Sequence, residues 1–258
     1  MTFRWLTVLG TFLGLTSVSS AADFRDLLEK RVYKDASGAE LKYRLMKPDG
    51  YDTKQKYPLV IFLHGAGERG DDNNAQLVHG VKEFAKDENR QKYPCFLIAP
   101  QSPKNQSWAS FRRNPSAEEA NKPAEPLRLT LELVDSLLKE FSIDSERVYI
   151  TGLSMGGYGT WDALARRPGF FAAAVPICGG ADLKNAEKIK DVPVWIFHGD
   201  KDNAVPVARS REMVEALKKA GGSPKYTEYP GVGHNSWDKA YADPEMFAWL
   251  FAQKRKKS

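Results

Sequence analysis

Residues 152–157, Gly152-Leu153-Ser154-Met155-Gly156-Gly157, are the most informative part of this sequence about its fold. It follows the apolar run Val148-Tyr149-Ile150 and precedes a helix-like run from Tyr158 to Arg167. A serine with glycine two positions to either side, on a strand-to-helix turn, is the pattern of a nucleophile elbow. Such a turn strains the serine backbone, and the glycines leave room for tight packing. The pattern predicts that Ser154 exposes its hydroxyl at the sheet edge and that the N–H of Met155 faces an oxyanion.

Candidate acid and base residues follow two later strands. Val194 to Phe197 resembles a buried strand and leads into a loop that contains Asp200 and Asp202. Tyr226 to Tyr229 resembles a last strand and leads into Gly231-Val232-Gly233-His234. The order serine, aspartate, histidine accompanies the nucleophile elbow and differs from the orders in chymotrypsin and subtilisin. The sequence therefore predicts a catalytic triad, with either aspartate as its acid.

An upstream strand supplies a second part of the site. Pro58 to Leu63 is a continuous apolar run, as expected for a parallel strand buried on both faces. It ends in His64-Gly65-Ala66-Gly67, where glycines let backbone N–H groups face a cavity. We expect the second oxyanion donor here, at the N–H of Ala66. His64 precedes the serine, breaks the triad order, and is interpreted as a structural residue that braces this loop.

These residues resemble a known group of enzymes. The chain resembles secreted α/β-hydrolase esterases grouped with polyhydroxybutyrate depolymerases, feruloyl esterases and predicted peptidases related to the prolyl oligopeptidase catalytic domain. The resemblance rests on segments between about residues 58 and 240: Leu63–Gly70, Ala99-Pro100-Gln101 with Trp108, Gly152–Trp161, His198-Gly199 with Asp202 and Val205-Pro206, and Gly233–Trp237.

The resemblance implies a fold and an activity. The fold is an α/β-hydrolase fold with a mostly parallel central sheet and helices on both faces, and the chemistry is serine ester hydrolysis. It also places the acid shortly before Val205-Pro206, which favours Asp202 and leaves Asp200 as a turn or capping residue. The cysteine pair that staples many extracellular depolymerases is missing from this sequence, which argues against a polymer-degrading role.

The expected mechanism needs the chain's own side chains only. Ser154 attacks the acyl carbonyl after His234 takes its proton, and Asp202 orients the imidazole. The N–H groups of Ala66 and Met155 bind the oxyanion. Neither a metal nor an organic cofactor is expected, because the Cys and His residues show no ligand spacing. Trp108 and Trp237 are candidate walls of the substrate pocket, alongside the alternative that each packs in the core.

The remaining segments complete an alternation of strands and helices, which predicts a mostly parallel sheet. A hairpin is expected at Arg31–Met46, further strands at Cys95–Ala99 and Ala172–Ile177, and helices at Pro126–Phe141, Val207–Lys219 and Pro244–Gln253. Two long polar segments, Glu68–Lys92 and Ser102–Ala124, follow strands and are expected to lie over the active site as loops. Neither contains the amphipathic helix of a lipase lid, so short-chain, aryl or carbohydrate-linked esters are expected substrates.

The N-terminus is expected to direct export. Arg4 precedes the apolar run Trp5–Val18 and the small-residue site Ser20-Ala21-Ala22, as in a signal peptide. Residues 1–22 would be removed and 23–258 would form a single catalytic domain in the periplasm or outside the cell. The run is too short for a convincing membrane span, so no stable membrane anchor is expected.

Charge and cysteine content add further limits. The formal net charge is +5, but acids and bases are interspersed, which disfavours nucleic-acid binding. The basic tail Lys254–Lys257 is interpreted as a frayed end. Cys95 opens one expected strand and Cys178 follows another, so the two are expected to be buried free thiols. Nothing in the sequence determines the oligomeric state.

Three other functions remain open at this stage. A serine peptidase of the prolyl oligopeptidase type would use the same triad, although that family usually adds a propeller domain for which this chain has no room. An acyltransferase would pass the acyl group to an alcohol and need the same geometry. A non-catalytic binding module is disfavoured, because Ser154, Asp202 and His234 are all present.

Overall fold

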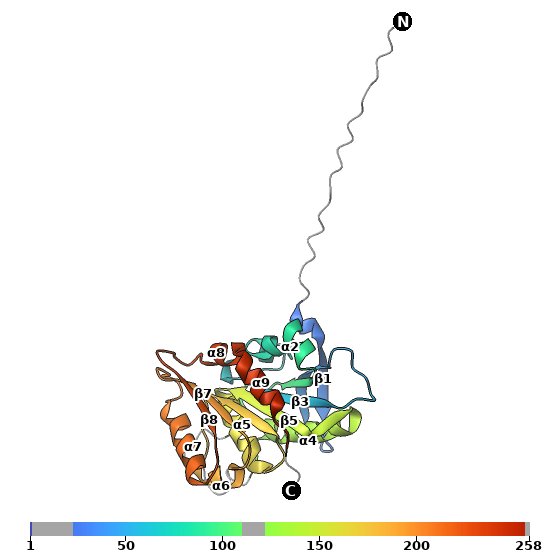
Figure 1. Ribbon diagram of the computed structural model, residues 1–258. Coiled ribbons are helices and arrows are strands. Elements are labelled where there is room, and N and C mark those ends of the chain that lie inside the picture. Colours follow the sequence, from blue (N-terminus) through green and yellow to red (C-terminus); the bar gives the residue numbers. More distant parts are fainter. Residues whose placement is uncertain (2–22, 110–121, 256–258) are drawn as a thin grey trace.

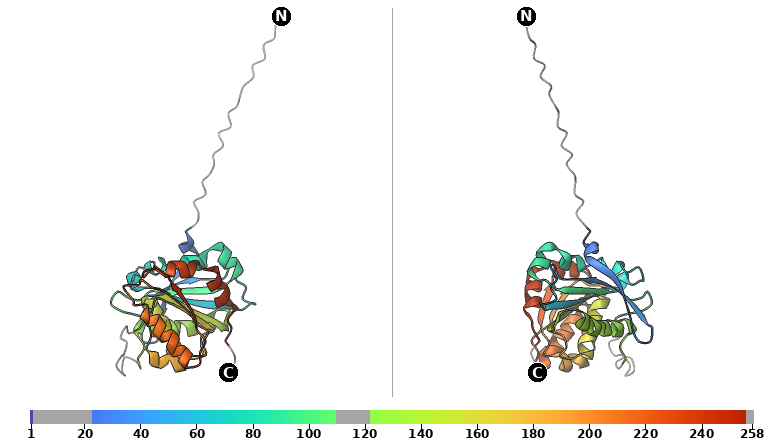
Figure 2. Two further views of the ribbon diagram at one scale, coloured as in Figure 1. Left: turned by 60° about the vertical axis from the view of Figure 1, so that its left-hand side comes forward. Right: turned by 90° about the vertical axis from the view of Figure 1, so that its right-hand side faces the viewer.

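Eight strands form one sheet at the centre of the protein, and helices cover both of its faces (Figures 1 and 2). This computed structural model describes residue 1 and residues 23–109 and 122–255. The strand order is β1-β2-β4-β3-β5-β6-β7-β8. The strands are β1 (Leu28–Lys34), β2 (Glu40–Met46), β3 (Tyr57–Leu63), β4 (Phe96–Pro100), β5 (Ile143–Leu153), β6 (Ala173–Ile177), β7 (Trp195–Gly199) and β8 (Lys225–Tyr229).

Only the first two pairings in this order are antiparallel. β1 pairs with β2, and β2 pairs with β4, in antiparallel register. From β4 through β3, β5, β6 and β7 to β8 every pairing is parallel. The carboxyl ends of these six strands therefore meet at one edge of the sheet, where ligands bind in open α/β sheets. The predicted α/β-hydrolase architecture is confirmed.

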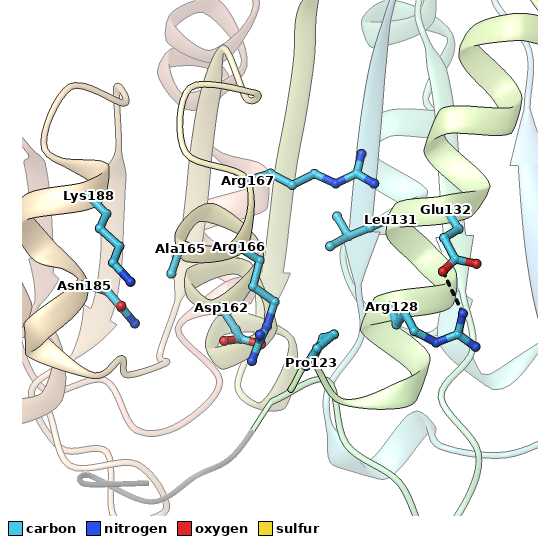
Figure 3. A pocket seen from close by; sticks show the side chains of 10 residues that line it. All are labelled: Pro123, Arg128, Leu131, Glu132, Asp162, Ala165, Arg166, Arg167, Asn185 and Lys188. Atoms are coloured by element: carbon cyan, nitrogen blue, oxygen red, sulfur yellow. Dashed lines mark hydrogen bonds and ion pairs between the residues drawn. The ribbon is translucent and has the colours of Figure 1, made fainter. Parts of the chain in front are cut away.

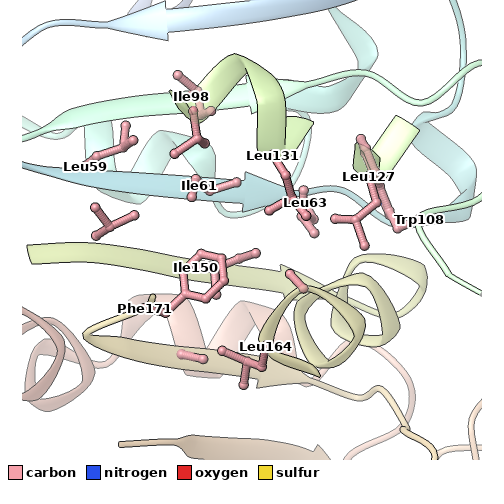
Figure 4. Packing of buried hydrophobic residues seen from close by; sticks show 14 of the residues in the cluster. Leu59, Ile61, Leu63, Ile98, Trp108, Leu127, Leu131, Ile150, Leu164 and Phe171 are labelled. Atoms are coloured by element: carbon pink, nitrogen blue, oxygen red, sulfur yellow. The ribbon is translucent and has the colours of Figure 1, made fainter. Parts of the chain in front are cut away.

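The inner parallel strands are largely buried on both faces, whereas the edge strand β8 is partly exposed. In β3 every residue is buried, and Leu59, Ile61 and Leu63 pack into one hydrophobic cluster (Figure 4). The alternating residues Val60 and Phe62 pack into a second cluster on the opposite face. This arrangement explains why the sequence of β3 is apolar throughout and does not alternate with polar residues.

The helices divide between the two faces according to these clusters. The first cluster includes side chains of α4, α5, α6 and α7, and the second includes side chains of α1, α8 and α9. The helices are α1 (Val81–Ala85), α2 (Asp87–Lys92), α4 (Glu125–Glu140), α5 (Met155–Arg166), α6 (Ala186–Ile189), α7 (Ala208–Lys219), α8 (Trp237–Ala242) and α9 (Pro244–Ala252). Short 3-10 turns are η1 (Phe24–Leu27), η2 (Ala66–Glu68), η3 (Ala75–Leu77) and η4 (Leu183–Asn185).

Most expected elements are present, with shifts of a few residues at their ends. The hairpin, the strand before the elbow and the helices α4, α7 and α9 are confirmed. The helix after the elbow begins at Met155 rather than Tyr158, because Ser154 itself occupies the position before the first helical residue. Residues 110–121 of the second polar segment lie outside the described residues.

The first polar segment is more ordered than expected. Residues 68–92 contain η3, α1 and α2, so the prediction of a plain loop is wrong. Val81 and Phe84 of α1 are buried, and the Phe84 ring lies 4.8 Å from that of Phe247 in α9. These contacts across the chain stabilise a five-residue helix that its own sequence is too short to maintain.

Three further expectations concern the chain ends and the cysteines. Cys95 and Cys178 are free and buried, as predicted. Lys254 pairs with Glu146 at 2.7 Å, so the start of the basic tail is not frayed, while residues 256–258 lie outside the described part. Within residues 23–109 and 122–255, no helix is both long and apolar enough to cross a membrane. The proposed signal peptide falls almost wholly on residues that the structure does not describe.

Candidate active site

Ser154 stands between β5 and α5 in a backbone conformation that L-amino acids rarely adopt. Its φ is 52° and its ψ is −115°. Conformations of this kind cost about 1–3 kcal/mol and persist only where the surrounding structure fixes them. Here the Ser154 N–H donates to the carbonyl of Ile177 at 2.9 Å, and the N–H of Tyr158 donates to the Ser154 carbonyl at 3.1 Å. The side chain is thereby fixed at the carboxyl edge of the sheet.

The glycines around Ser154 are required by close backbone approaches. A Cβ atom at Gly156 would lie 1.9 Å from the carbonyl oxygen of Leu63. A Cβ atom at Gly152 would lie 2.4 Å from the carbonyl oxygen of Gly156. Both neighbours are backbone atoms, which cannot move aside as a flexible side chain can. Any larger residue at either position would separate α5 from β3 and displace the serine.

The side chains of Ser154, His234 and Asp202 form a continuous hydrogen-bonded chain. Nε2 of His234 lies 2.9 Å from Oγ of Ser154, and Nδ1 of His234 lies 2.7 Å from Oδ2 of Asp202. Because a carboxylate only accepts hydrogen bonds, Nδ1 carries the hydrogen and Nε2 is free to accept the serine hydroxyl proton. The Asp202 side chain has no exposed surface, while that of His234 is 28% exposed. The structure thus brings the three predicted triad residues together.

The two candidate aspartates occupy different places. Oδ1 of Asp202 accepts from the backbone N–H groups of Ala204 and Val205 at 2.9 and 2.8 Å, which leaves Oδ2 for His234. Asp200 instead accepts from the N–H of Gly231 at 2.7 Å and joins the loop after β7 to the loop after β8. Asp202 is therefore the acid partner of His234 by geometry, and Asp200 is a turn residue.

The loop after β3 packs directly against the serine turn. A Cβ atom at Gly65 would lie 2.8 Å from Cδ1 of Leu153, immediately before Ser154. Ala66 is the first residue of η2, and Met155 is the first residue of α5. Backbone N–H groups at the first position of a helix have no acceptor within that helix. Both predicted oxyanion donors are thus at positions from which an N–H can point at a substrate.

His64 holds this loop in place by hydrogen bonds, in agreement with its structural interpretation. It is 1% exposed. Its Nε2 accepts from the N–H of Ser102 at 2.9 Å, so Nδ1 carries the hydrogen and donates to the Gly65 carbonyl at 2.6 Å. Burial lowers the pKa of His64 from 6.5 to about 4. The neutral imidazole therefore ties the loop after β3 to the end of β4.

The buried imidazole of His64 is expected to make the folded protein less stable in acid. The folded state holds the pKa of His64 below its unfolded value, so the unfolded state binds more protons, and stability falls as the pH drops from 6.5 to 4. This group contributes up to about 3 kcal/mol to that loss. Urea unfolding of the wild type and of His64→Gln over this range should show a weaker pH dependence in the variant. Equal dependence in both proteins would contradict the assignment.

Trp108 does not line the substrate site, and that prediction is corrected. The side chain is fully buried in the first hydrophobic cluster. Its Nε1 donates to the carbonyl of His64 at 3.0 Å, and its Cβ lies 2.4 Å from where a Cβ of Gly159 would stand. The absence of a side chain at Gly159 makes the space in which the indole packs against α5. Trp108 therefore supports the loop after β3 from within the core.

Trp237, in contrast, lies beside the triad. Its ring meets that of His234 at a centroid distance of 5.2 Å and an angle of 85°. A second neighbour of Trp237 is His79, whose ring lies 5.3 Å away and whose Nε2 is 3.7 Å from Oε1 of Glu68. No role was expected for His79 or Glu68 from the sequence. An aromatic ring, an imidazole and a carboxylate thus form a series of contacts that begins at His234.

One cluster of possible metal donors coincides with the triad. Donor atoms of Cys178, Asp202 and His234 lie within 4.8 Å of one another. Nδ1 of His234 carries a hydrogen in its bond to Asp202 and cannot bind a metal while that bond stands. Burial raises the pKa of the Cys178 thiol to about 12, so it is a neutral thiol. Asp202 and His234 are thus already used by the hydrogen-bonded chain, and Cys178 is protonated.

A separate cavity of about 390 Å³ lies between α4 and α5 (Figure 3). It is lined by basic residues, but Nη1 of Arg128 donates to Glu132 at 2.7 Å and Nε of Arg166 donates to Asp162 at 2.7 Å. None of its lining residues belongs to the triad. The chemistry described above is therefore confined to the sheet edge.

The sheet, its helices and the serine turn are those of an α/β hydrolase. Residues 51–248 match the phospholipase/carboxylesterase family, and the chain belongs to that family. It is accordingly a carboxylesterase-type hydrolase.

Individual relatives support the same conclusion. The chain is 43% identical to a thermostable esterase of known structure, with a TM-score of 0.85 over 90% of this chain and 64% of that one. It is 24% identical over 200 residues to a probable feruloyl esterase C from Aspergillus niger, covering 77% of this chain and 68% of that protein. It is 36% identical over 75 residues to a bifunctional acetylxylan esterase/xylanase from Neocallimastix patriciarum, which is 29% of this chain and 11% of that protein.

Proposed function

We propose that this protein is a serine ester hydrolase that works through an acyl-enzyme on Ser154. The observation that carries the proposal is the hydrogen-bonded chain from Ser154 through His234 to Asp202. An alkyl hydroxyl hardly ionises at neutral pH, so attack on an ester requires a base within hydrogen-bonding distance. His234 is such a base, and Asp202 holds it in the tautomer that can accept the proton.

The remaining steps use groups already in place. As the Ser154 oxygen bonds to the acyl carbon, His234 takes the hydroxyl proton and later gives it to the leaving alkoxide. The N–H groups of Ala66 and Met155 bind the oxyanion that forms, and losing one such donor typically costs about 3 kcal/mol of transition-state stabilisation. A water molecule then repeats the sequence and releases the acid.

The substrate is proposed to be a short-chain, aryl or carbohydrate-linked ester. The ring of Trp237 contacts that of His234, the ring of His79 contacts that of Trp237, and Glu68 lies beside His79. The flat face of an indole suits a sugar or aryl ring, and the two polar side chains can bond to hydroxyl groups. Burying a long acyl chain would instead need an extended apolar groove.

Rates across acyl chain length test this substrate class. We expect kcat/KM to be highest for acetyl to butyryl esters and to fall toward palmitoyl. A groove that buried the chain would gain about 0.8 kcal/mol per CH₂, and that gain should be missing here. The measurement is kcat/KM for a p-nitrophenyl ester series in soluble and emulsified form. A steady rise toward palmitoyl, with activation at an oil–water interface, would identify a lipase and refute the proposal.

A substrate panel separates ester hydrolysis from the two alternatives. Methyl ferulate, acetylated xylan and peptide amides distinguish an esterase from a peptidase of the prolyl oligopeptidase type. Added alcohol, with product analysis, distinguishes hydrolysis from acyl transfer. The proposal fails if amides are cleaved faster than esters, or if the acyl group passes mainly to the alcohol.

We also propose that the protein is exported after removal of residues 1–22. The support is the sequence itself, in which Arg4, the apolar run and the site Ser20-Ala21-Ala22 follow one another as in a signal peptide. Sequencing the amino terminus of the secreted or periplasmic protein would locate the cut, and recovery of the uncut chain from the cytoplasm alone would refute export.

A further inference from the structure

A second histidine contacts the acid of the triad. His198, in β7, has no exposed surface. Its Nε2 lies 3.2 Å from Oδ2 of Asp202 and 2.9 Å from the carbonyl oxygen of Val205. Its Nδ1 lies 2.7 Å from Oγ of Ser210, which is also buried. The mechanism described above assigns no role to this side chain.

The neighbours of His198 determine where its hydrogen lies. A carbonyl oxygen and a carboxylate oxygen can only accept, so Nε2 must carry a hydrogen, shared between Val205 and Asp202. Burial lowers the pKa of His198, which keeps the ring neutral, so Nδ1 is an acceptor. The Ser210 hydroxyl then donates to Nδ1. Every polar atom of this buried ring has a partner in this one tautomer only.

The same contacts complete the surroundings of the Asp202 carboxylate. Oδ1 accepts two backbone N–H groups, from Ala204 and Val205. Oδ2 lies between two imidazoles, Nδ1 of His234 at 2.7 Å and Nε2 of His198 at 3.2 Å. Without His198, Oδ2 would lose one of its two donors and would be held by His234 alone.

We propose that His198 is a positioning residue for the triad, whose Nε2–H holds Oδ2 of Asp202 in the place from which it orients His234. This inference rests on the proposed serine-hydrolase function. The shared hydrogen also draws negative charge away from Oδ2, so the carboxylate stabilises the imidazolium form of His234 less strongly.

Other ionisable groups lie near His198 and Asp202, and none of them changes its charge near neutral pH. The Cys178 thiol from the end of β6 is close to Asp202 and His234 and is neutral, because burial raises its pKa to about 12. The Tyr158 phenol of α5 is also neutral, because burial raises its pKa above the usual value of 10.0. Glu228 of β8 pairs with Arg211 and is the partner of His198 in the strand register. Each keeps one charge state across neutral pH.

Three variants test the proposal. His198→Phe keeps a flat ring and removes the donor, whereas His198→Gln can return an amide N–H to the position of Nε2. Ser210→Ala removes the contact at Nδ1 and leaves both acceptors of Nε2, so it is the matched control for disturbing the buried cluster. For each, kcat, KM and the pH profile of kcat/KM are measured with a short-chain ester, together with thermal unfolding.

The expected results separate positioning from packing. His198→Phe should lower kcat roughly tenfold with little change in KM, and move the acid limb of kcat/KM up by as much as about one pH unit. His198→Gln should restore most of both quantities. Ser210→Ala should lower the unfolding temperature and leave the acid limb in place. In the wild type, ¹⁵N chemical shifts should identify the Nε2–H tautomer of His198.

Several outcomes would overturn the inference. A wild-type spectrum with the hydrogen on Nδ1 would do so, as would a His198→Phe variant with an unchanged kcat and acid limb. A loss of kcat that is equal in His198→Phe and Ser210→Ala, without a shifted limb, would show that the ring only packs. If His198→Phe does not fold, the Gln variant and the wild-type spectrum decide. Activity that survives Ser154→Ala would refute the proposed function instead, which keeps the two failures distinct.

Discussion

Ser154→Ala is expected to lower kcat for ester hydrolysis by roughly a millionfold while the protein remains folded. The hydroxyl is the only part of the side chain that is lost. Its oxygen lies 2.9 Å from Nε2 of His234, to which it is hydrogen-bonded. Without it, neither the acyl-enzyme nor its proton transfer can form. The measurement is kcat with p-nitrophenyl acetate, with circular dichroism and thermal unfolding to verify the fold.

A second variant at this position separates chemistry from strain. Ser154→Gly should be equally inactive but more stable than Ser154→Ala, because glycine adopts a positive φ without steric cost. Labelling with a fluorophosphonate provides an independent readout. The wild type should take up one label on Ser154 and both variants none. A label on another residue, or hydrolysis that persists in both variants, would show that the nucleophile lies elsewhere.

Local sequence predicts the parts of the fold whose conformation depends on neighbouring residues in the chain. The apolar run at β3 needs burial on both faces, and the glycines beside Ser154 permit only a tight turn, whatever the rest of the chain does. The small helix α1 could not be predicted in this way. Its stability comes from Phe84 packing against Phe247, a residue far away in the sequence.

The same distinction explains why the sequence leaves two interpretations of Trp108 open. An aromatic face suits the wall of a substrate pocket, but it also suits packing in the core. Its position depends on Gly159, which leaves the space for its ring, and on the carbonyl of His64, to which it donates. Both partners are distant in sequence, and no periodicity of residues 102–124 reports on them. Glycine in the helix after the elbow is the one signal that could have indicated a large side chain packing there.

His198 illustrates the opposite case, in which the residue was visible and its role was not. The dipeptide His198-Gly199 contributed to the resemblance without a function attached to it. Only the distance of 3.2 Å to Asp202 connects it with the triad. Backbone geometry determines which side chain of a loop faces His234. For this reason, residue type alone could not decide between Asp200 and Asp202 as its partner.

Asp202→Asn is expected to lower kcat by roughly ten-thousandfold with the fold intact. The backbone N–H groups of Ala204 and Val205 both donate to Oδ1, so the amide oxygen of the variant must take that place. Its NH₂ group is then directed at Nδ1 of His234, which can accept only if its hydrogen has moved to Nε2. An Nε2–H cannot take the proton of Ser154, so the base is lost.

Asp200→Asn is the matched control, because the same change is made two residues away. Its amide oxygen can still accept from the N–H of Gly231, so the turn should survive and kcat should stay within about twofold of the wild type. The measurement is kcat and KM for both variants with one short-chain ester, with unfolding curves to show that both are native. If Asp200→Asn lost the greater activity while both proteins were folded, His234 would take its orientation from Asp200. A wild-type rate in Asp202→Asn would mean that ester hydrolysis does not depend on this hydrogen-bonded chain at all.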